Sequence, residues 1–199
     1  MTNYTVKMLF PTCIHEYVYE NFDEKELINF CYKEKEKNPD GLYNSNRGGW
    51  HSPFYDLSKD ENIISKTLSR GLGKSVFTSI NPNLGVNVQY WIMINFPNSY
   101  NTSHTHPDAH LSGVMWIKSK KNSGDLLLNN PFDFTGYVEC HSYIDEFKKN
   151  TAFYPTYKFE PITGKILTFP SSLRHEVSLN ETKEDRIAVS FNIRLSDIN

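Results

Sequence analysis

The spacing of apolar residues changes from extended to helical within the first forty residues. Residues 4–14 are strand-like, and Pro11 within them is typical of an edge strand, where one backbone N–H needs no partner. Apolar residues around Leu27 then recur at helical spacing, directly after a capping-box pattern at residues 21–24. The sequence therefore predicts an edge strand, followed by a helix over residues 23–37 that ends before a Pro-Asp-Gly turn.

A second apolar stripe runs through the segment that follows. Its members recur every four residues: Ile64, Leu68, Leu72, Val76 and Ile80. Ser58 and Glu61 repeat the capping signature before the stripe, and the Asn-Pro-Asn turn at residues 81–83 ends it. We expect one amphipathic helix between these signals despite Gly71 and Gly73. Both helices are expected to pack as supporting layers on a sheet.

The rest of the chain consists of short apolar or aromatic runs bounded by Gly, Pro, Asn and Ser. Seven such runs are predicted as strands: residues 86–96, 111–118, 125–128, 157–160, 165–169, 175–179 and 186–195. Successive strands without intervening helices favour a mainly β (α+β) fold, an antiparallel jelly roll. We expect a single domain over residues 1–199, with the N-terminal strand and supporting helices in 1–84 and the jelly-roll core in 85–199. The polar segment 129–155 is expected to be an irregular, functional insertion.

Composition excludes several classes of protein. The chain has 21 Lys and Arg against 23 Asp and Glu, a formal net charge of −2, so no overall positive field attracts nucleic acid. No apolar run approaches the roughly 18 residues of a membrane span, and the first residues lack the pattern of a secretory signal. The three cysteines are far apart, which argues against a disulfide framework or a zinc ribbon. We expect a cytoplasmic protein without nucleic-acid or membrane partners.

Abundant Asn, Lys, Ile and Tyr are consistent with an AT-rich source such as a phage or a marine bacterium, and for a phage protein the expected location is the host cytoplasm. The oligomeric state is left open by the sequence.

Histidines are concentrated in one short stretch: His104, His106 and His110. In an extended chain alternate side chains share a face, so His104 and His106 point the same way. His175, at the start of a distant predicted strand, is the candidate third metal ligand. Asp108 offers an alternative to His104, because it forms a His-x-Asp motif with His106 and a carboxylate better neutralises iron(II). Pro107 favours the three-histidine set, because the regular strand is expected to end near it.

A basic residue begins the last predicted strand. Alternation along this strand places four residues on one face: Arg186, Ala188, Ser190 and Asn192. An arginine on an otherwise well-packed strand needs an anion, and its planar guanidinium pairs with a carboxylate through two parallel hydrogen bonds, to which Ser190 can add a third. An ordinary ion pair between Arg186 and Glu184 or another acid is the alternative.

These residues fall in an ordered series of short motifs. HTHP at residues 104–107 is followed by LSGV at 111–114, FPSSLRH at 169–175 and RIAVSFN at 186–192. The series resembles the 2-oxoglutarate- and iron(II)-dependent oxygenases, in particular a small bacterial and phage group with the signature HxHP, LSGV, FPS, H, R and SFN. The resemblance covers most of the chain. It implies a double-stranded β-helix, an Fe(II) cofactor and 2-oxoglutarate as cosubstrate.

The resemblance also assigns roles to residues. It makes His104, His106 and His175 ligands of the iron, with Asp108 competing for the place of His104, and it gives Arg186 the far carboxylate of 2-oxoglutarate. The implied reaction is a hydroxylation by molecular oxygen that releases succinate and carbon dioxide. Its substrate is unidentified and is expected to be a small molecule or a protein side chain.

Two segments are the candidates for contacts with that substrate, residues 46–51 and the insertion at 129–155. Arg47, Trp50 and His51 lie in the first segment beside two glycines, which permit a close approach of the backbone. His51 and His110 are alternatively structural residues.

Several alternatives stay open. Trp116 and Tyr90 either line the cofactor pocket or pack in the core, while His15 and His141 are expected at the surface. A second possible function is a three-histidine, cupin-like dioxygenase that binds its organic substrate directly to iron without 2-oxoglutarate. A third is a jelly-roll binding or structural module without enzymatic activity.

Overall fold

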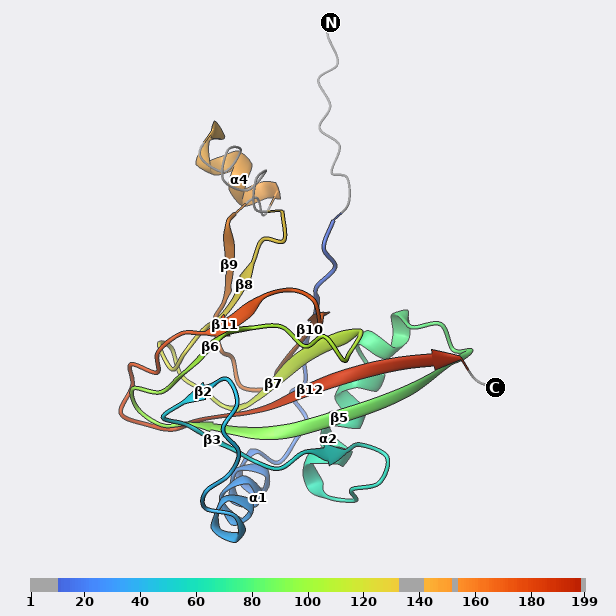
Figure 1. Cartoon of the computed structure of the whole chain (residues 1–199), viewed down its shortest axis with the longest axis vertical. Coiled ribbons are helices and arrows are strands. Elements are labelled where there is room, and N and C mark those ends of the chain that lie inside the picture. Colours follow the sequence, from blue (N-terminus) through green and yellow to red (C-terminus); the bar gives the residue numbers. More distant parts are fainter. Residues whose placement is uncertain (1–10, 133–141, 152–153, 198–199) are drawn as a thin grey trace, which may run out of the picture.

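The computed structural model of the protein describes residues 11–132, 142–151 and 154–197, which form two antiparallel β-sheets (Figure 1). Across the larger sheet the strands are β1 (His15–Val18), β10 (Lys165–Pro170), β7 (Leu111–Lys118), β12 (Arg186–Asp197), β5 (Leu84–Asn95) and β3 (Trp50–His51), with β4 (Tyr55–Asp56) also paired to β5. Across the smaller sheet they are β2 (Asn46–Arg47), β6 (Tyr100–His104), β11 (His175–Val177), β8 (Leu126–Asn129) and β9 (Thr156–Phe159). This arrangement confirms the predicted mainly β jelly roll.

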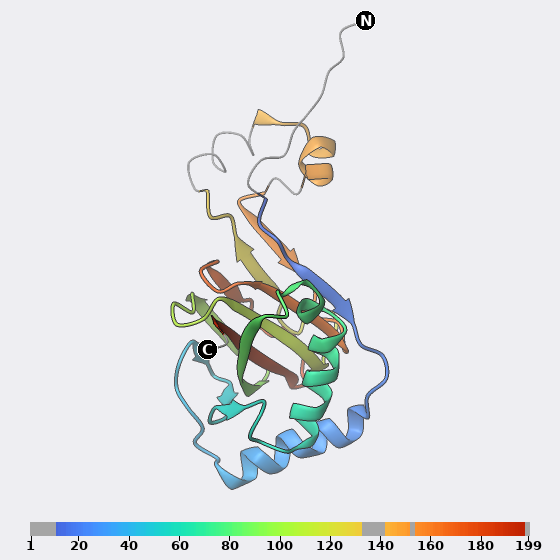
Figure 2. The same cartoon turned by 90° about the vertical axis from the view of Figure 1, so that its right-hand side faces the viewer.

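The larger sheet has a core on each of its faces. On the outer face, helices α1 (Glu24–Lys37) and α2 (Ile63–Gly73) pack against the sheet (Figure 2). Buried residues of this outer core include Leu27, Leu68, Ile92, Val189 and Phe191. A smaller inner cluster lies toward the second sheet and includes Val114, Trp116, Leu126, Leu167 and Ala188. The alternation predicted for the last strand is thus confirmed, because odd-numbered residues of β12 face the helices.

Each of the seven predicted strands is present, with ends that differ by at most two residues. The two-residue strands β2, β3 and β4 were not predicted, and β6 was not among the seven apolar runs, although the histidine motif at its end was expected on extended backbone. The residues of β6 are Tyr-Asn-Thr-Ser-His, which contain no aliphatic run. Periodicity detects a strand only when one of its faces is apolar.

Helix α1 agrees with its prediction, and Asp23 caps it by accepting a hydrogen bond from the Glu26 N–H at 2.9 Å. The prediction of one helix up to residue 80 is wrong. Helix α2 ends at Gly73, and a separate 3₁₀ turn follows at Val76–Ser79. Helix α2 also starts later than predicted, because Ser58 donates both its N–H and its hydroxyl to Asp56 in a turn.

Replacing Asn62 by alanine is expected to destabilise the fold by about 1–2 kcal/mol. The Asn62 side chain accepts the Ser65 N–H at 3.0 Å as the cap of α2, and it donates to the Tyr90 hydroxyl at 2.7 Å. The substitution removes a helix cap and a partner of a buried hydroxyl. Urea unfolding of Asn62→Ala measures the loss, and Asn83→Ala, at an exposed position, is the control. Equal stability of the two variants would contradict the capping role.

Two peripheral predictions need correction. Residues 4–10 of the predicted N-terminal strand lie outside the described residues, and residues 11–14 have no regular structure. The edge strand of the larger sheet is instead β1, which pairs with β10. The segment at 129–155, part of which lies outside the described residues together with His141, contains a short helix, α4 (Asp145–Thr151). Strands β8 and β9 extend from the sheet toward this helix (Figure 1).

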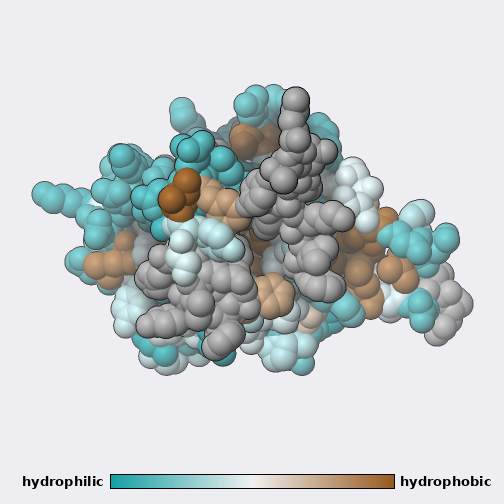
Figure 3. All heavy atoms as spheres, turned by 90° about the horizontal axis from the view of Figure 1, so that it is seen from above, coloured by the Kyte–Doolittle hydropathy of each residue, from teal (hydrophilic) through white to brown (hydrophobic). Residues whose placement is uncertain are grey.

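Seen from above, the described atoms are mainly hydrophilic, and hydrophobic side chains occur in separate patches (Figure 3). Among the described helices, none combines the length and the apolar character needed to cross a membrane.

Candidate metal centre

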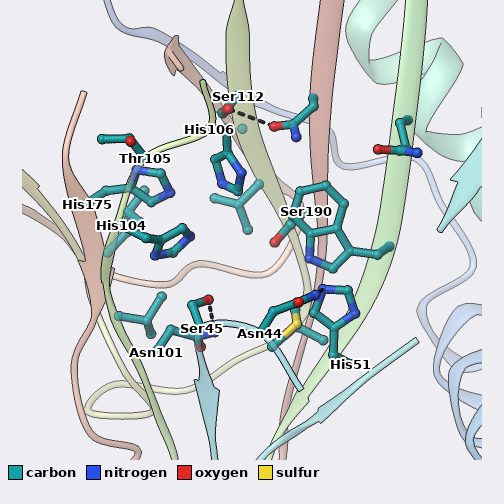
Figure 4. Close-up of a pocket in the computed structure, with 18 of the residues that line it drawn as sticks. Asn44, Ser45, His51, Asn101, His104, Thr105, His106, Ser112, His175 and Ser190 are labelled. Atoms are coloured by element: carbon teal, nitrogen blue, oxygen red, sulfur yellow. Dashed lines mark hydrogen bonds between the residues drawn. The ribbon is translucent and has the colours of Figure 1, made fainter. Parts of the chain in front are cut away.

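A cavity of about 630 Å³ lies between the two sheets. Its floor on the larger sheet is formed by alternate residues of β5 and β12: Gln89, Trp91, Met93, Arg186, Ser190, Asn192 and Arg194. The smaller sheet and the loops next to it supply the opposite wall, which includes three histidines (Figure 4). The register pairs Trp91 with Ser190 on neighbouring strands. The cavity therefore has a polar strip along its floor and a cluster of imidazoles above it.

The three histidines are His104, His106 and His175, and one potential ligand atom from each lies within 4.8 Å of the other two. His104 ends β6 and His175 begins β11, and the two residues are direct partners in the antiparallel register of these strands. His106 follows β6 by two residues, and its backbone N–H donates to the Ser171 carbonyl at 3.0 Å. Strand pairing thus brings together residues that are about 70 positions apart in the sequence.

Backbone contacts determine which ring nitrogen faces the cavity centre. His104 Nδ1 lies 2.7 Å from the Thr102 carbonyl oxygen, and His175 Nδ1 lies 2.8 Å from that of Leu173. A carbonyl only accepts hydrogen bonds, so both Nδ1 atoms carry the proton and both Nε2 atoms keep a lone pair. This second contact of the ring is typical of metal-binding histidines.

Burial keeps the cluster neutral. Desolvation, followed by the mutual repulsion of the imidazoles, lowers the pKa of His106 to about 4 and that of His175 to about 3. The pKa of His104 is also lowered, chiefly by burial. Three uncharged imidazoles at neutral pH are ready to coordinate a cation without first losing protons.

We expect the metal-free protein to lose stability as the pH falls from 7 to 4. The unfolded chain takes up protons on these imidazoles near pH 6.5, whereas folded His106 and His175 remain neutral down to about pH 4 and pH 3. The unfolded state therefore binds more protons in this interval, and acid favours unfolding. Calorimetric Tm values across this range measure the effect. The Tm of His106→Gln should depend less steeply on pH. An unchanged slope would contradict the lowered pKa of His106.

Asp108 is not a member of the histidine cluster. Its side chain is exposed at the rim of the cavity, and its backbone carbonyl accepts a hydrogen bond from Arg194 Nε at 2.6 Å. Of the two ligand sets that the sequence left open, the described residues thus bring together the one with three histidines. His110 is exposed, and its Nδ1 accepts the backbone N–H of Leu195 at 3.1 Å, away from the cluster.

Arg186 lies at the deep end of the cavity with 3% of its surface exposed. Its two terminal nitrogens donate to the Gly124 carbonyl and to Asn95 Oδ1, both at 2.9 Å, while Nε has no partner. The predicted alternative, an ion pair with Glu184, is not formed, because that carboxylate binds Lys118 and Lys120.

No other carboxylate of the described residues forms an ion pair with Arg186. Asp125 is near enough to oppose the lowering of the Arg186 pKa, but its Oδ2 lies 2.7 Å from Lys158 Nζ. Desolvation is the larger effect, and the pKa of Arg186 falls to about 10. At neutral pH the side chain is therefore a buried cation that forms no ion pair with a described carboxylate, and it faces the cavity that holds the histidines.

The three residues predicted to contact a substrate lie in different places. His51 lines the cavity, and its ring stacks on Trp91 with centroids 5.6 Å apart. Trp50 is buried in the outer core and donates its indole N–H to the Asn38 carbonyl at 2.8 Å. Arg47 binds backbone carbonyls and lies over the Tyr43 ring. Neither Trp50 nor Arg47 is among the residues that line the cavity.

Two tryptophans line the cavity, whereas Tyr90, which the sequence left open, does not. Trp116 lines the cavity, whereas Tyr90 belongs to the outer core. Trp91 was missed by the sequence analysis and lies next to His106, with ring centroids 5.7 Å apart. The signal was present, because the alternation that identified the inward face of the last strand also places Gln89, Trp91 and Met93 on one face of β5.

A protein-family model described as "Putative 2OG-Fe(II) oxygenase" matches residues 89–192, just over half of the chain. The chain belongs to this oxygenase family. Membership implies Fe(II) and 2-oxoglutarate, whereas the narrower bacterial and phage group stays a prediction. No curated protein matches the sequence.

Solved structures of other oxygenases share the fold at low sequence identity. A prolyl-4-hydroxylase from Pseudomonas putida is 14% identical, with 92% of each chain covered and a TM-score of 0.62. HygX from Streptomyces hygroscopicus, solved with nickel and 2-oxoglutarate, is 12% identical, with 90% of this chain and 82% of HygX covered and a TM-score of 0.57. A prolyl hydroxylase from Trichoplax adhaerens, solved with a hypoxia inducible factor peptide, is 16% identical, with coverage of 90% and 83% and a TM-score of 0.56.

Proposed function

We propose that this oxygenase hydroxylates its substrate with Fe(II) and 2-oxoglutarate, and releases succinate and carbon dioxide. One observation supports it above the others. Arg186, a buried cation that forms no ion pair with a described carboxylate, lines the same cavity as a cluster of three neutral imidazoles. A dicarboxylate that binds a metal at one end and an arginine at the other satisfies both groups.

The donor set fits the implied cofactor. His104, His106 and His175 would hold iron(II), for which imidazole is a suitable ligand. When bound, the metal supplies the activation of oxygen, and fewer than six protein ligands leave positions for the 2-oxoacid end of the cosubstrate and for oxygen. Arg186, with Ser190 on the same strand face, would hold the far carboxylate.

The residues that line the outer part of the cavity favour a substrate whose reacting group is uncharged. His51, Trp91 and Phe54 form an aromatic wall here, with Phe54 in edge contact with both other rings at 5.5 Å. Apart from Arg186, the charged residues among the described ones that line the cavity are Asp108 and Arg194, which have opposite signs. We therefore propose a neutral small molecule or protein side chain as substrate, oriented by the wall next to His106.

An anaerobic titration tests the proposal. Addition of 2-oxoglutarate to the Fe(II)-loaded protein should produce a weak visible charge-transfer band, and admission of oxygen should then yield succinate. A folded, iron-loaded protein that gives neither the band nor succinate would refute the function.

No carboxylate of the described residues joins the histidine cluster, which favours a second candidate, a three-histidine dioxygenase that binds its substrate directly to iron. The two functions differ in their cosubstrate. Oxygen consumption that requires 2-oxoglutarate in the wild type supports the first. Consumption that is independent of 2-oxoglutarate, and unchanged in Arg186→Leu, supports the second.

A further inference from the structure

Three buried side-chain donors or acceptors in the described part of the chain have no hydrogen-bond partner: Trp116 Nε1, Thr168 Oγ1 and Arg186 Nε. Two of the three, Trp116 Nε1 and Arg186 Nε, belong to residues that line the same cavity. Buried polar groups are almost always paired in folded proteins, because an unpaired one costs free energy. Two unpaired donors in residues that line one cavity therefore point to an acceptor, absent from the described residues, that could pair with both.

Strand pairing places the two residues near each other. Trp116 on β7 is the direct partner of Ala188 on β12, and Arg186 lies two residues before Ala188 on the same inward face. Trp116 itself is fully buried in the inner cluster. The indole and the guanidinium thus belong to neighbouring strands at the deep end of the cavity.

The chemistry of the two donors limits the classes of ligand that could bind them. The indole N–H only donates, and so does the guanidinium, so the missing partner must be an acceptor. The partners that Arg186 already has, the Gly124 carbonyl and the Asn95 amide oxygen, are uncharged and leave its positive charge for the ligand. A carboxylate has the required charge and offers two oxygens, one for each donor.

We propose that Trp116 donates its indole N–H to the far carboxylate of 2-oxoglutarate, beside Arg186, and so helps to select a dicarboxylate as cosubstrate. This inference rests on the proposed function. It gives Trp116 a specificity-determining role. A 2-oxoacid of the same length that ends in a methyl group would leave both donors unpaired, and a site built to pair buried donors rejects such an analogue.

The chain is suited to a direct test, because it has three tryptophans and therefore three indole N–H signals in a ¹H–¹⁵N spectrum. Trp50, Trp91 and Trp116 are assigned from single Trp→Phe variants. The protein is loaded with Zn(II), which is diamagnetic, and titrated with 2-oxoglutarate or with 2-oxopentanoate, which lacks the far carboxylate.

We expect 2-oxoglutarate to move the Trp116 signal downfield and 2-oxopentanoate to leave it in place. Trp50 is the internal control, because its N–H already binds the Asn38 carbonyl. Calorimetry should show about 10-fold weaker binding of 2-oxoglutarate to Trp116→Phe, the loss of one hydrogen bond to a charged group. Trp50→Phe, which alters a tryptophan outside the cavity, should bind within about twofold of the wild type.

The outcomes separate the two proposals. Binding of 2-oxoglutarate with an unmoved Trp116 signal would overturn the role of Trp116 and leave the proposed function intact. No binding to the metal-loaded wild type would overturn both. The spectrum is recorded on the wild-type protein, so the test stands even if Trp116→Phe folds poorly.

Discussion

Replacing His175 by alanine is expected to abolish tight metal binding. The residue supplies one of three imidazoles whose ligand atoms lie within 4.8 Å of each other, and its Nε2 is kept free by the Nδ1 contact to Leu173. Because loss of an outer-shell partner already costs 10-fold to 100-fold in metal affinity, loss of a ligand should cost more than about 100-fold. Anaerobic titration with Fe(II), or with Zn(II) as a redox-inert substitute, measures the affinity.

His104→Ala and His106→Ala should show the same loss, while Asp108→Ala should stay within about 10-fold of the wild type. His110→Ala is the matched control, because its ring contacts the backbone of Leu195 outside the cluster. If Asp108→Ala loses the metal and His104→Ala retains it, the His-x-Asp alternative is correct.

Replacing Arg186 by leucine is expected to weaken 2-oxoglutarate binding by roughly 100-fold, because charge-assisted hydrogen bonds at a buried site are lost. Arg186→Lys keeps the charge but not the planar donor geometry, so an intermediate loss is expected. Calorimetry on the metal-loaded protein measures the affinity, and circular dichroism checks the fold, because both substitutions also remove hydrogen bonds to Asn95 and Gly124.

Arg194 provides the matched control for this experiment. It lies on the same strand and lines the same cavity, but at the exposed rim, where it binds the Asp108 carbonyl. Arg194→Leu should therefore leave the affinity for 2-oxoglutarate nearly unchanged. An equal loss in both variants would mean that the cavity responds to overall positive charge and has no specific carboxylate site at its deep end.

Strand alternation was sufficient to place Arg186 correctly from the sequence. Residues of β12 alternate between an apolar face and a mixed face, and a period of two leaves a single possible orientation once one face is buried. The same reasoning grouped His104 with His106, which the structure brings together with His175. In both cases the signal is local to a few consecutive residues.

Trp50 and His51 show where local reasoning fails. Both were predicted to face a substrate, yet the two-residue strand β3 sends Trp50 into the outer core and His51 into the cavity. Their directions follow from pairing with Ile94 and Met93 on β5, more than forty residues away. A strand of two residues has no periodicity of its own, so only the long-range register decides which residue reaches the site.

Two of the three imidazoles owe their orientation to main-chain oxygens two residues earlier in the chain, at Thr102 and Leu173. A side-chain mutation at either position leaves the carbonyl in place. Where a carboxylate side chain orients the ring, one point mutation removes that support and weakens metal binding. Here the tautomers of His104 and His175 are set by backbone carbonyls, which a side-chain substitution does not remove. Substitutions around His104 and His175, in nature or in a directed-evolution library, therefore leave the support of these two rings in place.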